Sequence, residues 1–316
     1  MKKKTKYRIR NWRDYNRSLV NRGSLTFWIS EDLLANWIER EKTGGRGASP
    51  RYTEAAIVAM AQVKFVFHQA GRQTCGLVAS IFKLLKVSLP VPDHSTFSRR
   101  MAGVEVGLPV KPSQKPRHLV IDSTGLKVYG EGEWKVRTHG VSKRRTWRKL
   151  HLCLDAATGE ILVAGASENS VSDCQMFPEM LRSIAEEEEI EQISADGSYD
   201  RRKVYDVLNQ RGLKRAAIPP RRGAKIWQHG NSRKERLIRD ENLRAVRKKG
   251  RAKWKREANY HRRSLAETGV FRFKQIFTDK LQSRNQENQF QEMIIKCAAL
   301  NQITHLGMPD SYKVVA

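Results

Sequence analysis

The stretch KPSQKPRHLVID, residues 111–122, decides the fold class, because the residue pattern changes within it from helical to strand-like. Its prolines interrupt regular structure, and HLVID is a short apolar strand that ends in an acid. Two later segments resemble it: KLHLCLD (149–155) alternates polar and apolar residues, and IEQISAD (190–196) again ends in an acid. Helical patterns lie between and after these strands. The sequence therefore predicts an α/β fold downstream of residue 112.

The expected order of elements in this region is strand-strand-strand-helix-strand-helix-strand, followed by a basic segment. The predicted strands are 118–122, 149–155, 161–164, 190–196 and 214–219, and the predicted helices are 173–189, 201–211 and 291–303. Two shorter strand-like segments, 127–129 and 134–137, flank a Gly-Glu-Gly turn between the first two strands. The basic segment, 221–257, has fifteen Lys and Arg residues against four acids and shows no apolar period. It is predicted to be an insertion or a loosely structured lobe that meets phosphates.

The first 112 residues are predicted to be helical and basic. Residues 1–50 form a basic arm, in which nine Lys and Arg residues face one acid before residue 23, and a short amphipathic helix at 31–41. Residues 51–112 hold three helices, which begin near Thr53, near Thr74, and at Asp93 or Ser95. The third, DHSTFSRRM, offers small, polar and basic side chains near its start, as a base-reading helix does. The alternative is an ordinary three-helix packing unit.

Composition narrows the function classes. Of 316 residues, 60 are Lys or Arg and 33 are Asp or Glu, which gives a net charge of +27. Such a charge indicates a polyanionic partner, most commonly nucleic acid, although membrane-surface proteins share the bias. The four cysteines are scattered without a C-x-x-C pair, so we expect reduced thiols. No apolar run is long enough to span a bilayer, and we expect a soluble, cytoplasmic protein.

The stretch EANYHRRSLAETGVFRFK, residues 257–274, carries a polar stripe. At about 100° per residue, four of its side chains fall within roughly 60° of one helix face and extend over about 21 Å. They are Tyr260, Arg263, Glu267 and Lys274. A solvated surface helix is the alternative, because mixed charges are common on helices.

Two strand-end acids complete a candidate site. In open α/β sheets the carboxyl ends of the strands line the ligand crevice, so Asp122 and Asp196 approach each other if their strands are parallel neighbours. Glu267 can supply a third carboxylate from a helix beside them. Three carboxylates suit Mg²⁺ or Mn²⁺, and a pair of such ions clamps both oxygens of a displacement at phosphorus. Each aspartate alone is also explained as a turn cap.

These motifs resemble the DDE transposases of bacterial insertion sequences. Within that group the chain is similar to the branch with the spacing Y-x2-R-x3-E-x6-K, which Tyr260, Arg263, Glu267 and Lys274 match at every position. HLVIDSTGLKVYG looks like the first acidic motif, and ISADGSYD looks like the second. The segments KRRTWRKLHLCLD (143–155) and NQITHLGMP (301–309) look most like insertion-sequence family five.

The resemblance implies a fold, a cofactor and a partner. It implies an RNase H-like mixed sheet at 113–316, behind a helix-turn-helix-like DNA-binding domain at 51–112. It also implies Mg²⁺ or Mn²⁺, as two ions, held by Asp122, Asp196 and Glu267, which are the expected catalytic residues. The partner is double-stranded DNA, namely the terminal inverted repeats and a target, and the enzyme is expected to dimerise on DNA near the bacterial nucleoid. The expected DNA contacts are Tyr260, Arg263, Lys274, Lys143, Trp147, Arg148, Lys149 and Tyr199.

Three alternatives stay open at this point. Asp200, four residues beyond Asp196, is the ligand if the second strand runs longer. A metal-dependent DNA nuclease without strand transfer would use the same acids. A catalytically inactive relative that acts as a DNA-binding regulator is opposed by the intact acidic triad.

Overall fold

The computed structural model describes residues 6–41, 44, 49, 51–128, 146–228 and 236–314. The chain divides into two compact units, Met1–Pro109 together with Ala298–Ala316, and Val110–Cys297. The end of the segment predicted as catalytic therefore clusters with the N-terminal residues. In the part of the chain that the structure describes, no helix is long and apolar enough to cross a membrane.

The first unit is mainly helical. Its elements are β1 (Lys6–Ile9), α1 (Trp12–Asn21), α2 (Leu25–Trp28), α3 (Glu31–Ala35), α4 (Glu54–Val66), α5 (Gly71–Leu84), α6 (His94–Met101) and β8 (Ser311–Val314). β1 pairs antiparallel with β8. The basic arm is therefore anchored at residues 6–9, where its backbone hydrogen bonds are made within the unit.

Capping residues set the ends of these helices. The Thr53 side chain accepts a hydrogen bond from the Ala56 amide and begins α4, and Asp93 does the same for α6. The predicted helix 31–41 is wrong in its length, since α3 ends at Ala35. The chain leaves the helix there because the Trp37 side chain is fully buried and its indole donates to the Pro90 carbonyl oxygen, 2.8 Å away.

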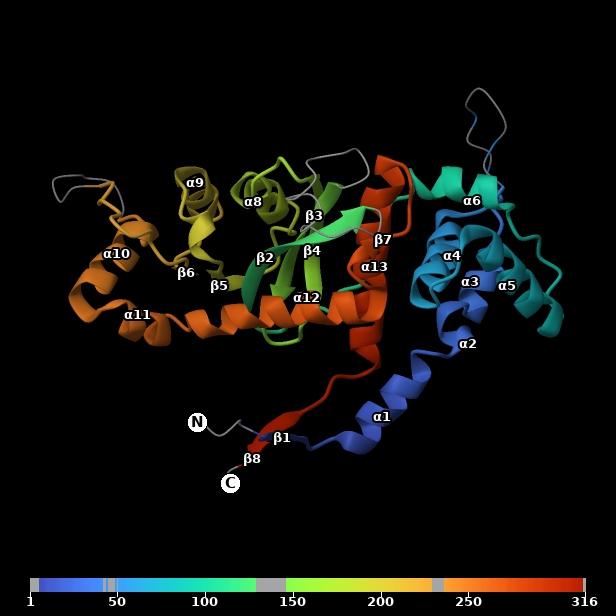
Figure 1. Cartoon of the computed structure of the whole chain (residues 1–316), viewed down its shortest axis with the longest axis horizontal. Coiled ribbons are helices and arrows are strands. Elements are labelled where there is room, and N and C mark those ends of the chain that lie inside the picture. Colours follow the sequence, from blue (N-terminus) through green and yellow to red (C-terminus); the bar gives the residue numbers. More distant parts are fainter. Residues whose placement is uncertain are drawn as a thin grey trace, which may run out of the picture. The chain divides into compact units, whose positions relative to one another are not determined.

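The second unit is built on a mixed sheet with the strand order β4-β3-β2-β5-β6, and β7 pairs with β2 (Figure 1). β3 lies antiparallel between β2 and β4, whereas β5 and β6 run parallel to β2. The predicted mixed α/β class is thereby confirmed. The elements are β2 (Arg117–Val128), β3 (Thr146–Asp155), β4 (Ile161–Glu168), α8 (Asp173–Arg182), β5 (Ile190–Ser194), η1 (Gly197–Tyr199), α9 (Arg202–Gln210), β6 (Ala216–Ala217), α10 (Ile238–Lys249), α11 (Arg251–Glu257), η2 (Tyr260–Arg263), α12 (Ser264–Phe277), β7 (Lys280–Leu281) and α13 (Gln286–Leu306), which continues into the first unit.

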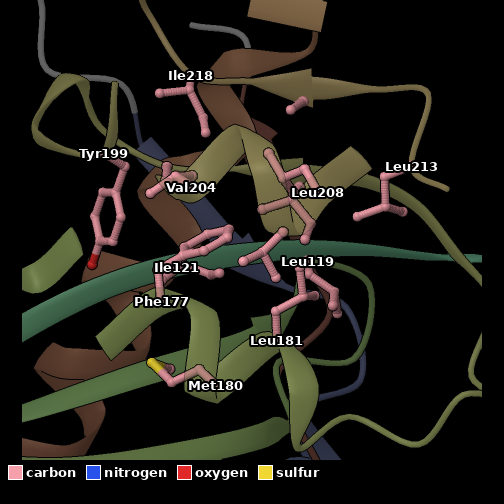
Figure 2. Close-up of a cluster of buried hydrophobic side chains, with 14 of the residues drawn as sticks. Leu119, Ile121, Phe177, Met180, Leu181, Tyr199, Val204, Leu208, Leu213 and Ile218 are labelled. Carbon is pink, nitrogen blue, oxygen red and sulfur yellow. The ribbon is translucent and has the colours of Figure 1, made fainter. Parts of the chain in front are cut away.

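The two faces of the sheet pack against different helices. Leu119 and Ile121 of β2 point to the face that α8 and α9 cover, where they join a buried cluster with Phe177 and Leu208 (Figure 2). Because successive side chains of a strand alternate, Val120 and Asp122 point to the opposite face. α12 packs against β2 and β3, on the side of the sheet that Leu154 faces. The alternation therefore decides that Asp122 points toward α12.

Several predicted boundaries are wrong. The strand 118–122 continues without a break to Val128, because β2 pairs with β3 along this whole length. The segment predicted as strand at 134–137 lies outside the described residues. The helix expected at 173–189 ends at Arg182, and the side chain of Arg211 donates to the carbonyl oxygens of Ile184 and Ala185 beyond it.

The basic segment 221–257 is folded where it is described, and the predicted loose lobe is wrong for residues 221–228 and 236–257. α10 and α11 pack together, with Leu243 and Trp254 buried between them and the rest of the unit. Arg239 is also buried, and its guanidinium lies over the Trp227 ring at 3.9 Å. Charge pairing replaces the apolar periodicity that the sequence lacks.

Gly269 explains how closely α12 approaches the sheet. A Cβ at this position would lie 2.4 Å from Cδ2 of Leu154, which is buried in β3. α12 runs as one α-helix across Gly269. We predict that Gly269→Ala lowers the free energy of unfolding by about 1 kcal/mol. Overpacking costs about 1–3 kcal/mol, and it outweighs the gain of about 1 kcal/mol in helix propensity.

Denaturant unfolding of Gly269→Ala, of Leu154→Ala and of the double variant measures this contact. The double variant should lose less free energy of unfolding than the two single variants lose together, because Leu154→Ala removes the clash. Gly76→Ala is the matched control, since a Cβ there meets no atom within 4 Å; it should stabilise the protein by about 1 kcal/mol. Stabilisation by Gly269→Ala as well would contradict the close-approach explanation.

Candidate active site

Asp122 of β2 and Asp196, which follows the parallel neighbour β5, lie at matching positions along the two chain segments. Val120 of β2 pairs with Ser194 of β5, and each aspartate follows its strand residue by two positions. The two carboxylates therefore lie on the same face of the sheet. Asp196 follows the end of β5, as predicted, whereas Asp122 lies in the middle of β2 and not at a strand end.

Arg263 joins two of the three predicted acids. Its Nη1 donates to Oδ2 of Asp122 at 3.1 Å, and its Nη2 donates to Oε1 of Glu267. The side chain of Arg263 is 18% exposed and that of Glu267 is 58% exposed. The acids of a strand and a helix are thus held by one guanidinium, whose planar fork suits two oxygen acceptors.

The charges of these groups act on one another. Burial raises the pKa of Asp122, and the charges of Asp196 and Glu267 raise it further, against the opposing effects of the Ser123 amide and of Arg263. Burial alone would lower the pKa of Arg263, but the negative charges of Asp122 and Glu267 raise it above its usual value. The site therefore concentrates negative charge, part of which Arg263 balances.

Asp196 is oriented by its own turn. Its Oδ1 accepts the backbone N–H of Ser198 at 2.8 Å and also the Ser198 hydroxyl. Sequence reasoning missed Ser198 as a positioning residue, although an Asp followed two residues later by Ser is a recognised turn signal. Both bonds are made to the same oxygen, so they fix the orientation of the Asp196 carboxylate.

The donor set has the chemistry of a site for a hard divalent cation. Asp122, Asp196 and Glu267 offer carboxylate oxygens, the ligands that Mg²⁺ and Mn²⁺ prefer. Across the described ranges, no group of three His, Cys, Asp or Glu side chains is gathered closely enough to hold an ion. Arg263 supplies the positive charge between Asp122 and Glu267 in this arrangement. A metal ion held by all three carboxylates would have to replace that guanidinium next to the exposed side chain of Glu267.

The polar stripe is divided between two kinds of helix. Tyr260 and Arg263 lie on the 3-10 helix η2, and Glu267 and Lys274 lie on the α-helix α12. The prediction of one continuous α-helix is therefore wrong at its start, where Asn259 has the left-handed φ of 50°. Burial raises the pKa of Tyr260, which also feels the charges of Arg263 and Asp196. Lys274 lies about two turns beyond Glu267, roughly 10 Å along the axis.

Asp200 belongs to a different environment from Asp196. Its side chain is 1% exposed, its Oδ1 accepts from Nε of Arg239 at 3.1 Å, and its Oδ2 accepts from the Arg221 amide at 2.9 Å. Asp240 lies next to the same guanidinium, at 3.2 Å. These contacts occupy the Asp200 carboxylate within the protein and favour Asp196 as the acid of the site.

The remaining predicted DNA contacts are placed in several environments. Lys143 lies outside the described residues. Trp147 is half-buried and its indole lies against Gly125, while Nε of Arg148 donates to Gln289 at 3.0 Å. Tyr199 is 1% exposed and packs on Phe177, with the ring centroids 5.8 Å apart. The structure contradicts a direct DNA contact by Tyr199, because the residue lies in the hydrophobic core.

Lys149 is also used within the protein. Its ammonium group donates to the Val171 carbonyl oxygen at 2.8 Å and to Asp173 at 3.3 Å. Beside it, His151 is fully buried and its Nε2 lies 2.8 Å from the Ser167 hydroxyl oxygen. Burial, together with the charge of Lys149, lowers the pKa of His151 to about 4, against the effect of Asp173.

This histidine predicts a loss of stability in mild acid. The unfolded chain takes up a proton on His151 near the ordinary value of about 6.5, but the folded chain takes it up only near pH 4. The folded state therefore loses about 2 kcal/mol from this group between pH 7.5 and pH 5. Denaturant unfolding at both pH values measures this decrease in the free energy of unfolding, and it should be smaller by about 2 kcal/mol in His151→Gln. The control His261→Gln, at an exposed position, should show the full decrease. An unchanged pH dependence in His151→Gln would contradict the prediction.

Basic side chains are exposed on α10 and α11. Lys255 of α11 lies over the Tyr260 ring at 4.9 Å, and exposed basic side chains occur on the same two helices. They are Arg247, Lys248, Lys249, Lys253 and Arg256. Positive charge next to concentrated carboxylates suits a polyanion whose phosphate must reach a cation site.

Comparison with known proteins gives two family models and a distant structure. Two models described as "Transposase DDE domain" match the chain, one over residues 20–131 and the other over residues 113–302. The second covers more than half of the chain and includes Asp122, Asp196 and Glu267. The cryo-EM structure of the piggyBac transposase synaptic complex with hairpin DNA is 12% identical, with a TM-score of 0.42, over 90% of this chain and 73% of that chain.

Proposed function

The chain belongs to the family of DDE transposases, and on this premise we propose that it binds the terminal inverted repeats of an insertion sequence and moves them by metal-dependent cleavage and strand transfer. One observation carries the proposal. Asp122 from β2 and Glu267 from α12 share the guanidinium of Arg263, and Asp196 lies beside Asp122 at the end of the parallel neighbour β5. The proposal is supported by the bridge that Arg263 makes between two of the three acids, which come from elements far apart in sequence.

Transposase DDE domains generally use divalent metal ions. We assign Asp122, Asp196 and Glu267 as the ligands of Mg²⁺ or Mn²⁺, in a pair of ions. Bound there, such ions would polarise the phosphate and lower the pKa of the attacking water or 3′-hydroxyl. The chain itself positions the DNA: the Arg263 fork matches phosphate oxygens, and Tyr260 and Lys274 contact the backbone on either side of it.

The finer assignments are part of the same proposal. We place the chain in insertion-sequence family five, in a bacterial cytoplasm near the nucleoid. The helices of residues 51–112 would recognise the terminal DNA, and an RNase H-like core would cut it. Two ends must be cut together, which requires two active sites, so we propose that the protein dimerises on DNA.

A cleavage and joining assay tests the function. Purified protein is incubated with the genomic DNA that flanks the gene on both sides, a target plasmid, and Mg²⁺, Mn²⁺ or EDTA. We expect metal-dependent cuts at the borders of short inverted repeats, followed by joining to the plasmid. Cuts without joining would identify a nuclease, and binding without cuts would identify a regulator. Either result overturns the proposed transposition.

Arg263→Gln should weaken binding to the flanking DNA and reduce its salt dependence. One lost phosphate contact lowers the slope of log K against log salt by about 1. Fluorescence anisotropy between 50 mM and 200 mM salt measures this slope. Arg215→Gln is the matched control, because Arg215 is exposed and pairs with Glu191 away from the site. If Arg263→Gln changes only the stability, Arg263 serves the carboxylates and not the DNA.

A further inference from the structure

The connection between α4 and α5 has the length of a helix-turn-helix turn. α4 ends at Val66 and α5 begins at Gly71, so residues 67–70 make the turn, within the three to four residues typical of this motif. His68 takes the left-handed φ of 54°, and the Gln69 amide donates to the Lys64 carbonyl oxygen at 2.8 Å. The connection from α5 to α6, residues 85–93, is much longer. α5 therefore holds the position of the second helix of the motif.

α5 presents a mostly polar and basic face to solvent. Its exposed positions lie on one side of the helix. They are Arg72, Gln73, Gly76, Ala79, Ser80, Lys83 and, at the C-terminal end, Leu84. The opposite side buries Val78 and Phe82. No acid occurs in α5, and among the described residues neither Arg72 nor Lys83 forms an ion pair.

Gly76 lowers the stability of α5, and no contact among the described residues requires a glycine there. A glycine in a helix interior is about 1 kcal/mol less favourable than alanine, and a Cβ at Gly76 would point into open space. At Gly269 a side chain would clash with Leu154, whereas at Gly76 no described residue would meet a Cβ. A glycine at this position would let an external surface approach the helix backbone closely.

α6 is the poorer candidate, although its sequence first suggested base reading. Its polar side chains are used within the unit: the Ser95 hydroxyl donates to Asp93 at 2.5 Å, the Thr96 hydroxyl donates to Asp93 at 2.7 Å, and Arg100 donates to the Tyr52 carbonyl oxygen at 3.0 Å. Hydrogen bonds from Ser95 and Thr96 hold the pKa of Asp93 far below its usual range. The exposed carboxylate of Asp93 thus lies at the N-terminal end of α6. This end would have to enter a groove lined by phosphates, which would repel the negative charge.

We propose that α5, and not α6, is the helix that enters the major groove of the terminal DNA. Arg72, in its first turn, contacts base edges, as the start of a recognition helix does, and Arg is the side chain most often bound to guanine. Gly76 and Ala79 let the helix approach the groove, and Lys83 reaches a phosphate. The proposal rests on the proposed function, because it names the element through which the transposase recognises its DNA.

Competition binding tests the assignment. Full-length protein is titrated into a labelled duplex from the DNA flanking the gene, with a scrambled duplex of equal length as competitor. Arg72→Ala should lower the preference for the flanking duplex about 10- to 100-fold, and binding to the scrambled duplex should change little. Gly76→Leu should lose the preference to a similar extent without a lower melting temperature, because Leu is a strong helix former and a Cβ at this position meets no atom within 4 Å.

The matched controls lie on α6. Ser95→Ala and Arg99→Ala should keep the preference within about 3-fold, since a surface residue outside the groove contributes little. Loss of preference in these variants, with Arg72→Ala and Gly76→Leu unchanged, overturns the choice of α5. If the unaltered protein shows no preference for the flanking duplex at all, the proposed function fails together with the helix assignment. Arg72→Gln, with melting curves, separates a folding defect from a binding defect.

Discussion

Asp122→Asn, Asp196→Asn and Glu267→Gln should each reduce metal-dependent DNA cleavage by more than about 100-fold and leave DNA binding nearly unchanged. Each change removes one negative charge and keeps the shape of the side chain. Substitutions of groups that only orient a metal ligand already cost 10- to 100-fold in affinity or activity, so the loss of a ligand itself should exceed that range. Single-turnover cleavage of the flanking DNA at saturating protein measures the effect.

Two further measurements make this result specific to the site. Asp206→Asn makes the same chemical change on the exposed side of α9, and its cleavage rate should equal that of the unaltered protein. Isothermal titration with Mn²⁺ alone should show weaker binding for the three site variants and not for the control. A variant of Asp122, Asp196 or Glu267 that cleaves at the full rate would remove that residue from the site.

Asp200→Asn should lower the free energy of unfolding by about 3 kcal/mol, because it leaves the buried guanidinium of Arg239 without one of its charged partners. The side chain of Arg239 is 4% exposed, and among the described residues its remaining partners are Asp240, the Lys225 carbonyl oxygen and the Trp227 ring. Denaturant unfolding measures the loss. Asp196→Asn, four residues earlier in the same motif, should cost no more than about 1 kcal/mol, the usual value of a capping side chain.

Measurements of stability and of cleavage thus distinguish the roles of the two aspartates in this motif. Asp196→Asn is expected to be stable and inactive, whereas Asp200→Asn is expected to be unstable, and active while it stays folded. A stable, inactive Asp200→Asn would reverse the assignment and make Asp200 the ligand. Cleavage by Asp200→Asn is therefore measured well below its melting temperature.

Much of the second unit follows from local patterns. The order of strands and helices after residue 112 was predictable because apolar alternation and helical periodicity are local properties of the chain. The ends of elements were less predictable, since they depend on partners. β2 runs past Asp122 to Val128 because β3 pairs with it over that length, and α3 stops at Ala35 because Trp37 is taken into the core.

The basic segment shows why composition alone misled. Residues 221–257 lack an apolar period, yet α10 and α11 are stable because Arg239, Asp240 and Asp200 pair inside the unit. Paired charges can be buried when each finds its partner and its hydrogen bonds. The partner of Arg239 is 39 positions away in the sequence, so no local pattern reveals it.

The sequence by itself determined the residue types of the proposed site: the carboxylates Asp122, Asp196 and Glu267, the spacing from Tyr260 to Lys274, and the positive charge that indicates a polyanion. The tertiary structure decided how these residues are used. It turned Asp122 toward α12 through the alternation of β2, placed Arg263 between Asp122 and Glu267, and removed Tyr199 from the surface into the core. The physical reason is that side-chain type is written at each position, whereas proximity, burial and charge pairing arise only when distant segments pack.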